Sequence, residues 1–364
     1  MKEKNLIIFM PTIIKGGGVE KNFFIISNYL ATRLKKISVI TLSKIARKKL
    51  NKKIKIIHPK NNLIENFSRR LKFLISLIFL FREILSNKNS TVFCFQGIIY
   101  CILLCKLTRT EVIIRSNSSP SGWSKNFLKQ ILYKKIYGLA DKIIVNSLSF
   151  QRELHDKFNL KSICIYNPLN INEINKHSKK NTKIKFFKKE SIKIICVARL
   201  SEQKDHDCLV KSINILKNDY NIKLILLGSG PLKNTINNSI KSLKLEKNIK
   251  IIEFKQNPYP YILKSDLLIL SSKYEGLPNV LLEAIVLKKF VISSDCPTGP
   301  REILDGGKGG DLFKVGDYLT LSKKIKFFIH KKKEINSKKT YASKRLKRFS
   351  YRNRLQDYLN VIKN

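Results

Sequence analysis

Short apolar runs alternate with longer stretches of mixed polar and apolar residues along the whole chain. A buried strand of a parallel sheet reads as one such short run, whereas a helix needs a longer, periodic pattern. The runs of the first half are NLIIFM, ISVITL, TVFCF, EVIIRS and KIIVNS, and those of the second half are IKIICVA, KLILLG, IKIIEF, DLLILS and FVISS. This rhythm predicts an α/β protein with parallel sheets and helices on their faces.

A polar, Lys-rich segment that begins at Asn167-Pro168 separates the two halves. A residue before proline is biased towards extended backbone, so this pair is expected to end a strand. We therefore predict two doubly wound domains, residues 1–167 and 191–345, joined by a linker over 168–190. Ligands of such sheets bind beyond the carboxyl ends of the strands, so the loops that follow the runs are the places to search for chemistry.

Composition adds a strong positive charge. The 364 residues include 72 Lys and Arg against 26 Asp and Glu, a formal net charge of +46. Such a surface attracts polyanions, either nucleic acid or an anionic membrane. The lysines are spread along the chain together with abundant Ile and Asn, so the compositional drift of an AT-rich genome explains them equally well, and both interpretations stay open.

Cysteines and apolar segments bear on the cellular compartment. The seven cysteines lie mostly in apolar runs, with no C-x-x-C pair or His-spaced cluster, which is typical of reduced core residues in the cytoplasm. The apolar N-terminal run is broken at Pro11 and fits a first strand better than a signal peptide. The longest apolar stretch, residues 71–81, is shorter than the roughly 18 to 20 residues of a spanning helix, so we expect any membrane contact to be peripheral.

Residues 67–85 combine cationic flanks with this apolar stretch, as an interfacial helix does. A core helix of the first sheet is the alternative. The core helix is the favoured interpretation because the apolar residues run nearly all the way round.

The stretch YEGLPNVLLEAI sets Glu275 and Glu283 eight positions apart. Pro278 is a typical first helical residue, and Asn279 or the backbone before it can cap the helix. Glu275 then lies in the loop and Glu283 in the second helical turn. The N-terminus of such a helix favours an anion such as a phosphate. Two solvent-exposed acids are the alternative.

Three further loops follow predicted strands. KGGGVEKN contains Gly17 and Gly18 but lacks the G-K-[ST] ending of a P-loop. CVARLSEQKDHD places Arg199 and Lys204 after a strand, where two cations suit a diphosphate, although solvated lysines and arginines are common in so basic a chain. LLGSGPLK adds Gly228.

Taken in order, G-G-G-V-E, V-A-R-L-x-x-x-K, L-G-S-G-P, E-G-L-P-N-V-L-L-E-A-I and S-D-C-P-T-G-P-R-E-I-L resemble retaining glycosyltransferase family 4. The resemblance covers nearly the whole chain. It implies the GT-B fold, two Rossmann-like domains that face a central cleft, with residues 346–364 forming a C-terminal helix that crosses back to the first domain. The C-P-T-G-P-R-E-I-L variant is similar to the branch that builds bacterial polysaccharide and lipid-linked oligosaccharides.

The resemblance implies transfer of a hexose or N-acetylhexosamine, with retention, from a UDP-sugar to a lipid-linked or polysaccharide acceptor. The product would belong to O-antigen, capsule, lipopolysaccharide or a glycoprotein glycan. The expected co-substrate is the nucleotide-sugar, with no cofactor and no metal. Such an enzyme works in the cytoplasm, on the anionic cytoplasmic face of the inner membrane.

The same resemblance assigns roles to residues. Arg199 and Lys204 would neutralise the diphosphate leaving group, and Glu275 would contact the transferred sugar. Glu283 would bind the ribose hydroxyls, and the nucleotide base would lie near Phe254 to Gln256. The implied donor contacts are Glu283, Gly276, Leu277, Pro278, Asn279, Gly228, Phe254, Gln256, Gly17 and Gly18.

The stretch IIRSNSSPSGW departs from many relatives, which place a histidine near the reacting sugar. Arg115 and Asn117 occupy it here and are expected on the acceptor side, as in relatives with an Arg-Asn pair. A retaining glycosidase would need both glutamates at one bond, which the ribose role of Glu283 excludes. A nucleotide-sugar epimerase of the same fold and a polyanion-binding protein remain as alternatives, although no nucleic-acid-binding motif is present, so no specific nucleic-acid partner is expected.

Overall fold

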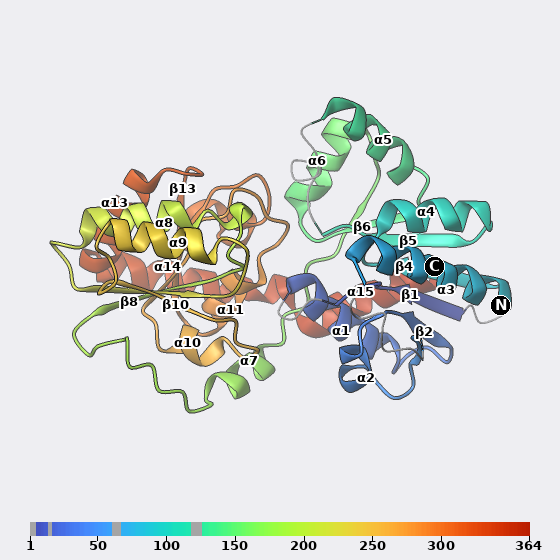
Figure 1. The fold of residues 1–364 in the computed structure, drawn as a ribbon, viewed down its shortest axis with the longest axis horizontal. Helices are drawn as coiled ribbons and strands as arrows, with labels where there is room; N and C mark the ends of the chain where they lie inside the picture. Colours follow the sequence, from blue (N-terminus) through green and yellow to red (C-terminus); the bar gives the residue numbers. More distant parts are fainter. Residues whose placement is uncertain (1–4, 14–16, 60–66, 118–125) are drawn as a thin grey trace. The chain divides into compact units, whose positions relative to one another are not determined.

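The computed structural model describes residues 5–13, 17–59, 67–117 and 126–364, which form two compact units (Figure 1). The first unit contains the described residues up to Pro168 together with Arg352–Asn364, and the second is Leu169–Tyr351. Gly16 of the glycine-rich loop and residues 118–125 of the expected acceptor loop lie outside the described residues.

The first unit is built on a seven-stranded sheet in the order β3-β2-β1-β4-β5-β6-β7. Every neighbouring pair is parallel, and β1 lies between β2 and β4. Its strands are β1 (Asn5–Phe9), β2 (Ile37–Ile40), β3 (Lys55–Ile57), β4 (Ser90–Cys94), β5 (Glu111–Arg115), β6 (Lys142–Val145) and β7 (Ile163–Cys164). Its helices are α1 (Gly18–Leu30), α2 (Ile45–Lys49), α3 (Arg69–Ser86), α4 (Ile98–Leu107), α5 (Phe127–Tyr137), α6 (Leu148–Phe158) and, from its second residue on, α15 (Tyr351–Lys363).

The second unit repeats this plan with a six-stranded parallel sheet in the order β10-β9-β8-β11-β12-β13. Its strands are β8 (Ile192–Val197), β9 (Ile222–Leu227), β10 (Ile249–Ile252), β11 (Leu267–Leu270), β12 (Phe290–Ser294) and β13 (Asp311–Phe313). Its helices are α7 (Ile171–Ser178), α8 (His206–Leu216), α9 (Lys233–Ser242), α10 (Tyr259–Leu263), α11 (Asn279–Val286), α12 (Pro300–Ile303), α13 (Tyr318–His330) and α14 (Lys332–Arg345). Short 3-10 turns are η3 (Glu202–Lys204), η4 (Asp305–Gly307) and η5 (Leu346–Phe349).

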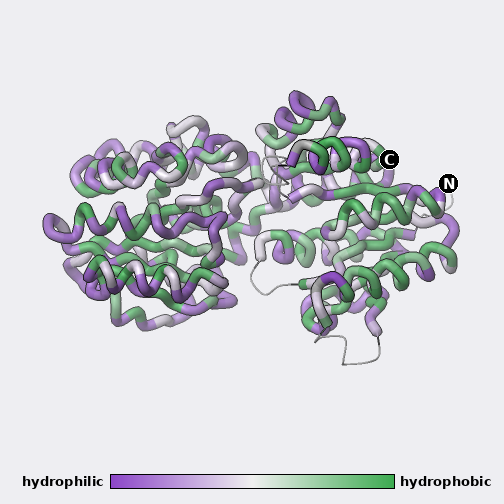
Figure 2. Tube along the Cα trace, turned by 45° about the horizontal axis from the view of Figure 1, so that its top comes forward, coloured by the Kyte–Doolittle hydropathy of each residue, from purple (hydrophilic) through white to green (hydrophobic). Residues whose placement is uncertain are grey.

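The sheets form because their strands are apolar along their length and buried on both faces, as parallel strands require. β1, β4, β11 and β12 are buried at every residue. Figure 2 shows hydrophobic residues concentrated along the central strands of each unit and hydrophilic residues on the outer turns of many helices. The prediction of two doubly wound α/β sheets is confirmed.

Each apolar run predicted as a strand forms one. The strands that the pattern missed are β3, β7 and β13, which have three, two and three residues. All three lie at an edge of their sheet. An edge strand is short and is covered less completely, so it carries too few apolar residues to form a recognisable run.

The predicted linker over residues 168–190 is wrong. α7 packs against α10 and α11, and the backbone N–H of Leu169 donates to the carbonyl of Phe349 at 3.0 Å. The Asn257 side chain also donates to the carbonyl of His177 at 2.9 Å. The segment is therefore part of the second unit, and its polar, Lys-rich composition reflects solvent exposure on one side.

α3 is buried on one face and exposed on the other. It buries Leu80 and Ile84 in the core of the first unit. Its opposite face exposes Leu74 (58%), Ile78 (53%) and Leu85 (57%). The large apolar side chains exposed on and just before α3 follow each other at alternating intervals of four and three residues, which places them on one stripe; they are Phe67, Leu71, Leu74, Ile78, Phe81 and Leu85. The favoured interpretation, a core helix, is correct for one face of α3 only.

Candidate functional site

The second sheet changes direction at β8, because β9 flanks β8 on one side and β11 on the other. The loops that leave the carboxyl ends of β8 and β11 meet at this switch point, the place where doubly wound sheets have the crevice that binds their ligands. The loop after β8 carries Arg199 and Lys204, and the loop after β11 carries Glu275. The topology thus brings together the three residues expected to act in catalysis.

Glu275 and Lys204 form an ion pair in this crevice. The Lys204 Nζ donates to Oε1 of Glu275, and the Ser272 hydroxyl donates to the same oxygen at 2.6 Å. Both charged side chains are largely buried. A buried pair loses hydration on both partners, so it persists where geometry and extra hydrogen bonds compensate, and here the Ser272 hydroxyl supplies one.

The backbone around Glu275 is fixed by side chains from neighbouring loops. The Thr298 hydroxyl donates to the carbonyl of Glu275, and Gln203 Nε2 donates to the carbonyl of Tyr274 at 2.8 Å. Gln203 belongs to the turn that also carries Lys204. The two partners of the ion pair are therefore held by contacts on their own backbones as well as by each other.

Arg199 differs from Lys204 in its surroundings. Its side chain is exposed and, among the residues that the structure describes, its guanidinium has no hydrogen-bond or ion-pair partner. An unpaired guanidinium beyond a strand's carboxyl end keeps all its donors available for a phosphate group. Within the described residues, Arg199 is thus a cation without a partner, whereas Lys204 is already balanced by Glu275.

α11 begins one residue later than predicted. Pro278 occupies the N-cap position with an extended backbone, and Asn279 is the first helical residue, so Asn279 is not the cap. Glu283 lies in the second turn, as expected. The neighbouring loop approaches closely because Gly299 has φ +92°, and a Cβ there would lie 2.3 Å from the carbonyl oxygen of Gly276. Glycine is required at this position both for its backbone conformation and for space.

Glu283 points back into the second unit. Its side chain is buried, and the Tyr259 hydroxyl of α10 lies 3.5 Å from its Oε1. Burial keeps this carboxylate in a defined position, which a ligand hydroxyl could then meet. The expected ribose contact remains a prediction.

The loops after β9 and β10 are joined. The Ser229 hydroxyl donates to Oε2 of Glu253 at 2.6 Å, and the N–H of Phe254 donates to the Ser229 hydroxyl at 3.1 Å. Lys233 pairs with the other oxygen of Glu253. The hydrogen bond from Lys233 has the largest effect on the pKa of Glu253 and the one from Ser229 the second largest, and both hold this pKa below its usual value.

The residues expected near the nucleotide differ in exposure. Phe254 and Gln256 are exposed, so both are accessible to a ligand. Gly228 is buried against β8, since a Cβ there would lie 1.9 Å from the carbonyl oxygen of Ala198. Gly228 therefore allows two strand ends to approach each other, whether or not it contacts a ligand.

Buried neutral groups lie near the ion pair. Burial, and then the Lys204 charge, lowers the pKa of His206 to about 4, so the imidazole is neutral at pH 7. Burial raises the pKa of the Cys196 and Cys296 thiols to about 12. These groups contribute no charge, so Lys204, Glu275 and Arg199 set the local electrostatics.

In the first unit, Gly17 is the N-cap and Gly18 the first residue of α1, the next helix after β1, and β1 is the strand at which this sheet changes direction. The carboxylate of Glu20 folds over Gly17, since a Cβ on Gly17 would lie 1.7 Å from Glu20 Oε2. The glycines therefore accommodate a side chain of their own helix.

The structure gives Arg115 a role other than the expected acceptor contact. Its side chain is fully buried. Nε donates to the Tyr358 hydroxyl at 2.8 Å, one terminal nitrogen donates to Asn167 Oδ1 at 2.7 Å, and the other donates to Asn117. The Asn117 amide in turn donates to the carbonyl of Phe95 at 3.2 Å. Arg115 thus holds Asn117 and α15 in place and does not reach solvent.

Sequence reasoning missed several supporting residues, namely Ser229, Glu253, Lys233, Gln203, Ser272 and Thr298. All but Thr298 lie within five residues of a predicted site residue, and Thr298 belongs to the C-P-T-G-P motif, so the signal was the proximity of polar side chains to strand ends and to that motif. In the described part of the chain, no three His, Cys, Asp or Glu side chains cluster as a metal site. No described helix is both long and apolar enough to cross a membrane.

Residues 177–345 match the family model for glycosyl transferases group 1. An uncharacterized glycosyltransferase of Methanocaldococcus jannaschii is 34% identical over 222 residues, which are 57% of this chain and 55% of that protein. The aligned stretch thus spans about half the length of this relative.

A second relative aligns over more of its length. The N-acetylgalactosamine-N,N'-diacetylbacillosaminyl-diphospho-undecaprenol 4-alpha-N-acetylgalactosaminyltransferase of Campylobacter jejuni is 28% identical over 260 residues, 69% of each chain. Among solved structures, Anabaena HepE in complex with UDP-glucose superposes with a TM-score of 0.80 at 16% identity, covering 98% of this chain and 99% of that one. These matches confirm the GT-B fold and the resemblance to glycosyltransferases.

Proposed function

We propose that this protein, whose residues 177–345 match the group 1 glycosyl transferases, transfers a sugar from a nucleotide-sugar to an acceptor during synthesis of a bacterial cell-surface glycan. One observation carries the proposal. The buried Glu275–Lys204 pair lies at the topological switch point of the second sheet, with the unpaired Arg199 on the same loop as Lys204. A fixed carboxylate beside a free cation suits a sugar attached to a diphosphate.

We propose UDP as the nucleotide of the donor. Support comes from a neighbour of similar fold, since HepE was solved with UDP-glucose bound. Glu283 would accept hydrogen bonds from the ribose hydroxyls, and Phe254 would lie against the base. A hexose or N-acetylhexosamine is the proposed transferred sugar, and the Campylobacter relative's name contains an N-acetylhexosamine.

The proposed reaction is a same-face substitution at the anomeric carbon. The bond from this carbon to the diphosphate oxygen breaks, and the acceptor oxygen forms a new bond on the same face. The departing phosphate oxygen takes the proton of the acceptor hydroxyl. Arg199 and Lys204 would stabilise the charge that develops on the leaving group, so no metal and no protein nucleophile is needed. Glu275 would hold the sugar and keep Lys204 in place.

The proposed acceptor is lipid-linked or polymeric, and the proposed location is the cytoplasmic face of the inner membrane. The Campylobacter relative is named for a diphospho-undecaprenol substrate. In this chain, α3 exposes an apolar stripe, and Arg70 and Arg82 of the same helix are exposed with it. Apolar side chains together with cations suit the surface of an anionic bilayer.

The test measures thermal unfolding of the full chain in the presence of UDP-, GDP- and ADP-sugars. Each sugar nucleotide is added with and without a divalent metal. We expect one UDP-sugar to stabilise the protein independently of metal, because a ligand that binds only the folded state raises its stability. A folded protein that gains no stability from any nucleotide-sugar would contradict the proposed function. Stabilisation only with metal would contradict metal independence alone.

A further inference from the structure

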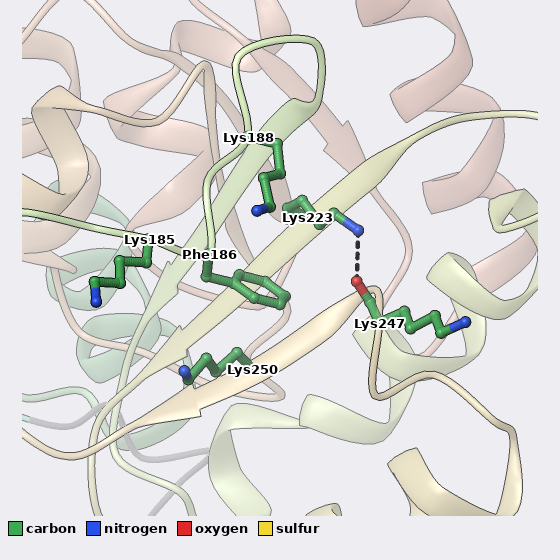
Figure 3. Close-up of a pocket in the computed structure, with 6 residues that line it drawn as sticks. All are labelled: Lys185, Phe186, Lys188, Lys223, Lys247 and Lys250. Carbon is green, nitrogen blue, oxygen red and sulfur yellow. Dashed lines mark hydrogen bonds between the residues drawn. The ribbon is translucent and has the colours of Figure 1, made fainter.

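A basic pocket lies in the second unit at the amino ends of β9 and β10 (Figure 3). The candidate site lies at the other end of the strands, beyond their carboxyl ends. Its cavity volume is about 370 Å³. We call it the lysine pocket, and it is lined by Lys185, Phe186, Lys188, Lys223, Lys247 and Lys250.

The pocket is assembled from three separate segments. Lys223 and Lys250 are the second residues of β9 and β10, and Lys250 is in register with Ile225. Lys223 and Ile225 are two residues apart in β9, so Lys223 and Lys250 project from the same face of the sheet. The turn before β8 supplies Lys185, Phe186 and Lys188, and the turn before β10 supplies Lys247. The fold itself brings five lysines to one cavity.

The pocket has internal order. The Lys223 Nζ lies 5.9 Å from the centroid of the Phe186 ring, and it donates to the carbonyl of Lys247 at 2.6 Å. Figure 3 shows the Phe186 ring projecting between the two strand lysines, Lys223 and Lys250. The Phe186 ring is thus fixed to one lysine by a cation–π contact.

Within the described residues, none of the five lysines forms an ion pair with a carboxylate, although other lysines of this unit do, such as Lys233 and Lys338. Lys193 of β8 also lies directly opposite Lys223. Like charges in adjacent positions repel, and an anion that binds between them removes this repulsion. Among the residues that the structure describes, no carboxylate therefore pairs with the charge of the pocket.

We propose that the lysine pocket binds a phosphate group, carried either by a phospholipid headgroup or by a soluble phosphorylated compound. The flexible side chains of several lysines at one cavity can bring their ammonium groups to the oxygens of a phosphate from several directions, and each is a compact point charge. The pocket is distinct from the donor site. Lys223 and Leu227 lie at opposite ends of β9, about 13 Å apart at the rise of an extended strand, so one diphosphate cannot occupy both.

The test compares two variants of the full chain that remove the same charge. The pocket variant carries Lys185→Gln, Lys188→Gln and Lys250→Gln. The control carries Lys323→Gln, Lys332→Gln and Lys333→Gln, exposed lysines of α13 and α14 outside the pocket. Binding of inorganic pyrophosphate is measured by calorimetry with UDP in excess, and hydrogen exchange checks that both variants fold.

We expect the pocket variant to bind pyrophosphate at least tenfold more weakly than the control variant. Equal loss in both variants would overturn the proposal, because it would reflect net charge alone. Unchanged binding in the pocket variant would also overturn it. Neither outcome depends on turnover, so the inference can fail while the proposed function stands.

Vesicles then identify the source of the phosphate. Co-sedimentation is measured with phosphatidylglycerol in phosphatidylcholine and with phosphatidylcholine alone. If the pocket variant loses binding to the anionic vesicles relative to the control variant, the pocket takes a lipid headgroup. If only pyrophosphate binding is lost, the pocket takes a soluble phosphorylated compound.

Discussion

Glu275 is the residue on which the proposed chemistry depends most. We expect Glu275→Ala to lower turnover with a working donor by about a hundredfold or more, the scale seen when a preorganised group at a reacting centre is removed. The substitution removes a proposed contact to the sugar and leaves Lys204 without its partner. The positions of the sugar and of the Lys204 side chain are therefore both expected to change. The measurement is the steady-state rate with the donor found by the panel.

Glu202 offers a matched control for this experiment. It is also a glutamate paired with a lysine, Lys273, at 3.3 Å, on the same two loops. Its side chain is 87% exposed whereas that of Glu275 is 9% exposed, so its pair contributes little. We expect Glu202→Ala to keep nearly full turnover. A Glu275→Ala protein as active as Glu202→Ala would remove Glu275 from the mechanism.

His206 makes the second unit sensitive to acid. Its folded pKa of about 4 lies below the unfolded value near 6.5, so the unfolded chain takes up a proton that the folded one does not. Stability is therefore lost as pH falls from about 6.5 to 4, by up to about 3 kcal/mol. We expect His206→Gln to lose less stability than wild type between pH 7 and 4.5, measured by hydrogen exchange of β9.

The exposed His330 of the same unit gives the comparison. His330→Gln should keep the pH dependence of the wild type, because it removes an exposed imidazole and leaves the buried His206 in place. Identical pH profiles for His206→Gln and wild type would show that burial of His206 does not set the acid sensitivity.

Residue types and local order were visible in the sequence, whereas side-chain partners were not. Lys204 and Glu275 are separated by 71 residues, and only the adjacency of β8 and β11 brings them together. An apolar run predicts a strand but not its place in the sheet. Arg115 likewise has partners that the sequence did not predict, since three hydrogen bonds hold its buried side chain, and its expected place on the acceptor side stays a prediction.

At the scale of elements, α15 is tied to the first sheet by a buried contact. The Tyr358 hydroxyl accepts from Arg115 Nε of β5. Tyr358→Phe leaves a buried charged donor without this partner, which costs about 1.5 to 3 kcal/mol. We expect faster hydrogen exchange in α15 and β5.

Tyr29 provides the control for this helix. Its hydroxyl also bonds to α15, at Gln356, with a distance of 2.9 Å, but the contact is exposed. Water replaces an exposed hydrogen bond at little cost, so Tyr29→Phe should leave exchange in α15 unchanged. Equal effects of the two substitutions would mean that the Arg115 contact contributes no more than a surface bond.

α3 carries the element-scale prediction about membranes. We expect Leu74→Gln, Ile78→Gln and Leu85→Gln together to weaken binding to anionic vesicles at least tenfold, because exposed apolar side chains that enter a bilayer interface contribute to binding in proportion to their buried area. These side chains are exposed in the folded chain, so thermal stability should change little. Co-sedimentation with phosphatidylglycerol-containing vesicles measures the effect.

Exposed apolar residues of the second unit give the control triple. Ile215→Gln, Leu263→Gln and Leu319→Gln remove comparable side chains that do not form such a stripe. If both triples weaken vesicle binding equally, α3 is not the membrane-contacting element. If neither does, the scattered lysines alone account for membrane binding.

The pattern of apolar residues predicted the central elements well and the peripheral ones poorly. Central strands are buried on both faces, so their sequence must be apolar throughout. The segment 168–190 was mistaken for a linker because α7 contributes few buried side chains, Ile174 among them, and the rest of that helix is polar. A helix that buries only one or two residues among many polar ones leaves almost no hydrophobic pattern in a single sequence.

At the scale of the whole molecule, non-specific binding caused by the net charge of +46 must be distinguished from binding of the donor. We expect the protein to bind double-stranded DNA without sequence preference, with an affinity that falls steeply between 50 and 200 mM salt, because binding through lysines and phosphates releases counterions. Stabilisation by the donor should change much less over this range, since Lys204 and Glu275 are largely buried and therefore weakly screened. Titration of two unrelated duplexes at several salt concentrations, beside thermal unfolding with the donor, measures both. A hundredfold preference for one duplex, together with no donor effect, would favour a nucleic-acid-binding protein over a transferase.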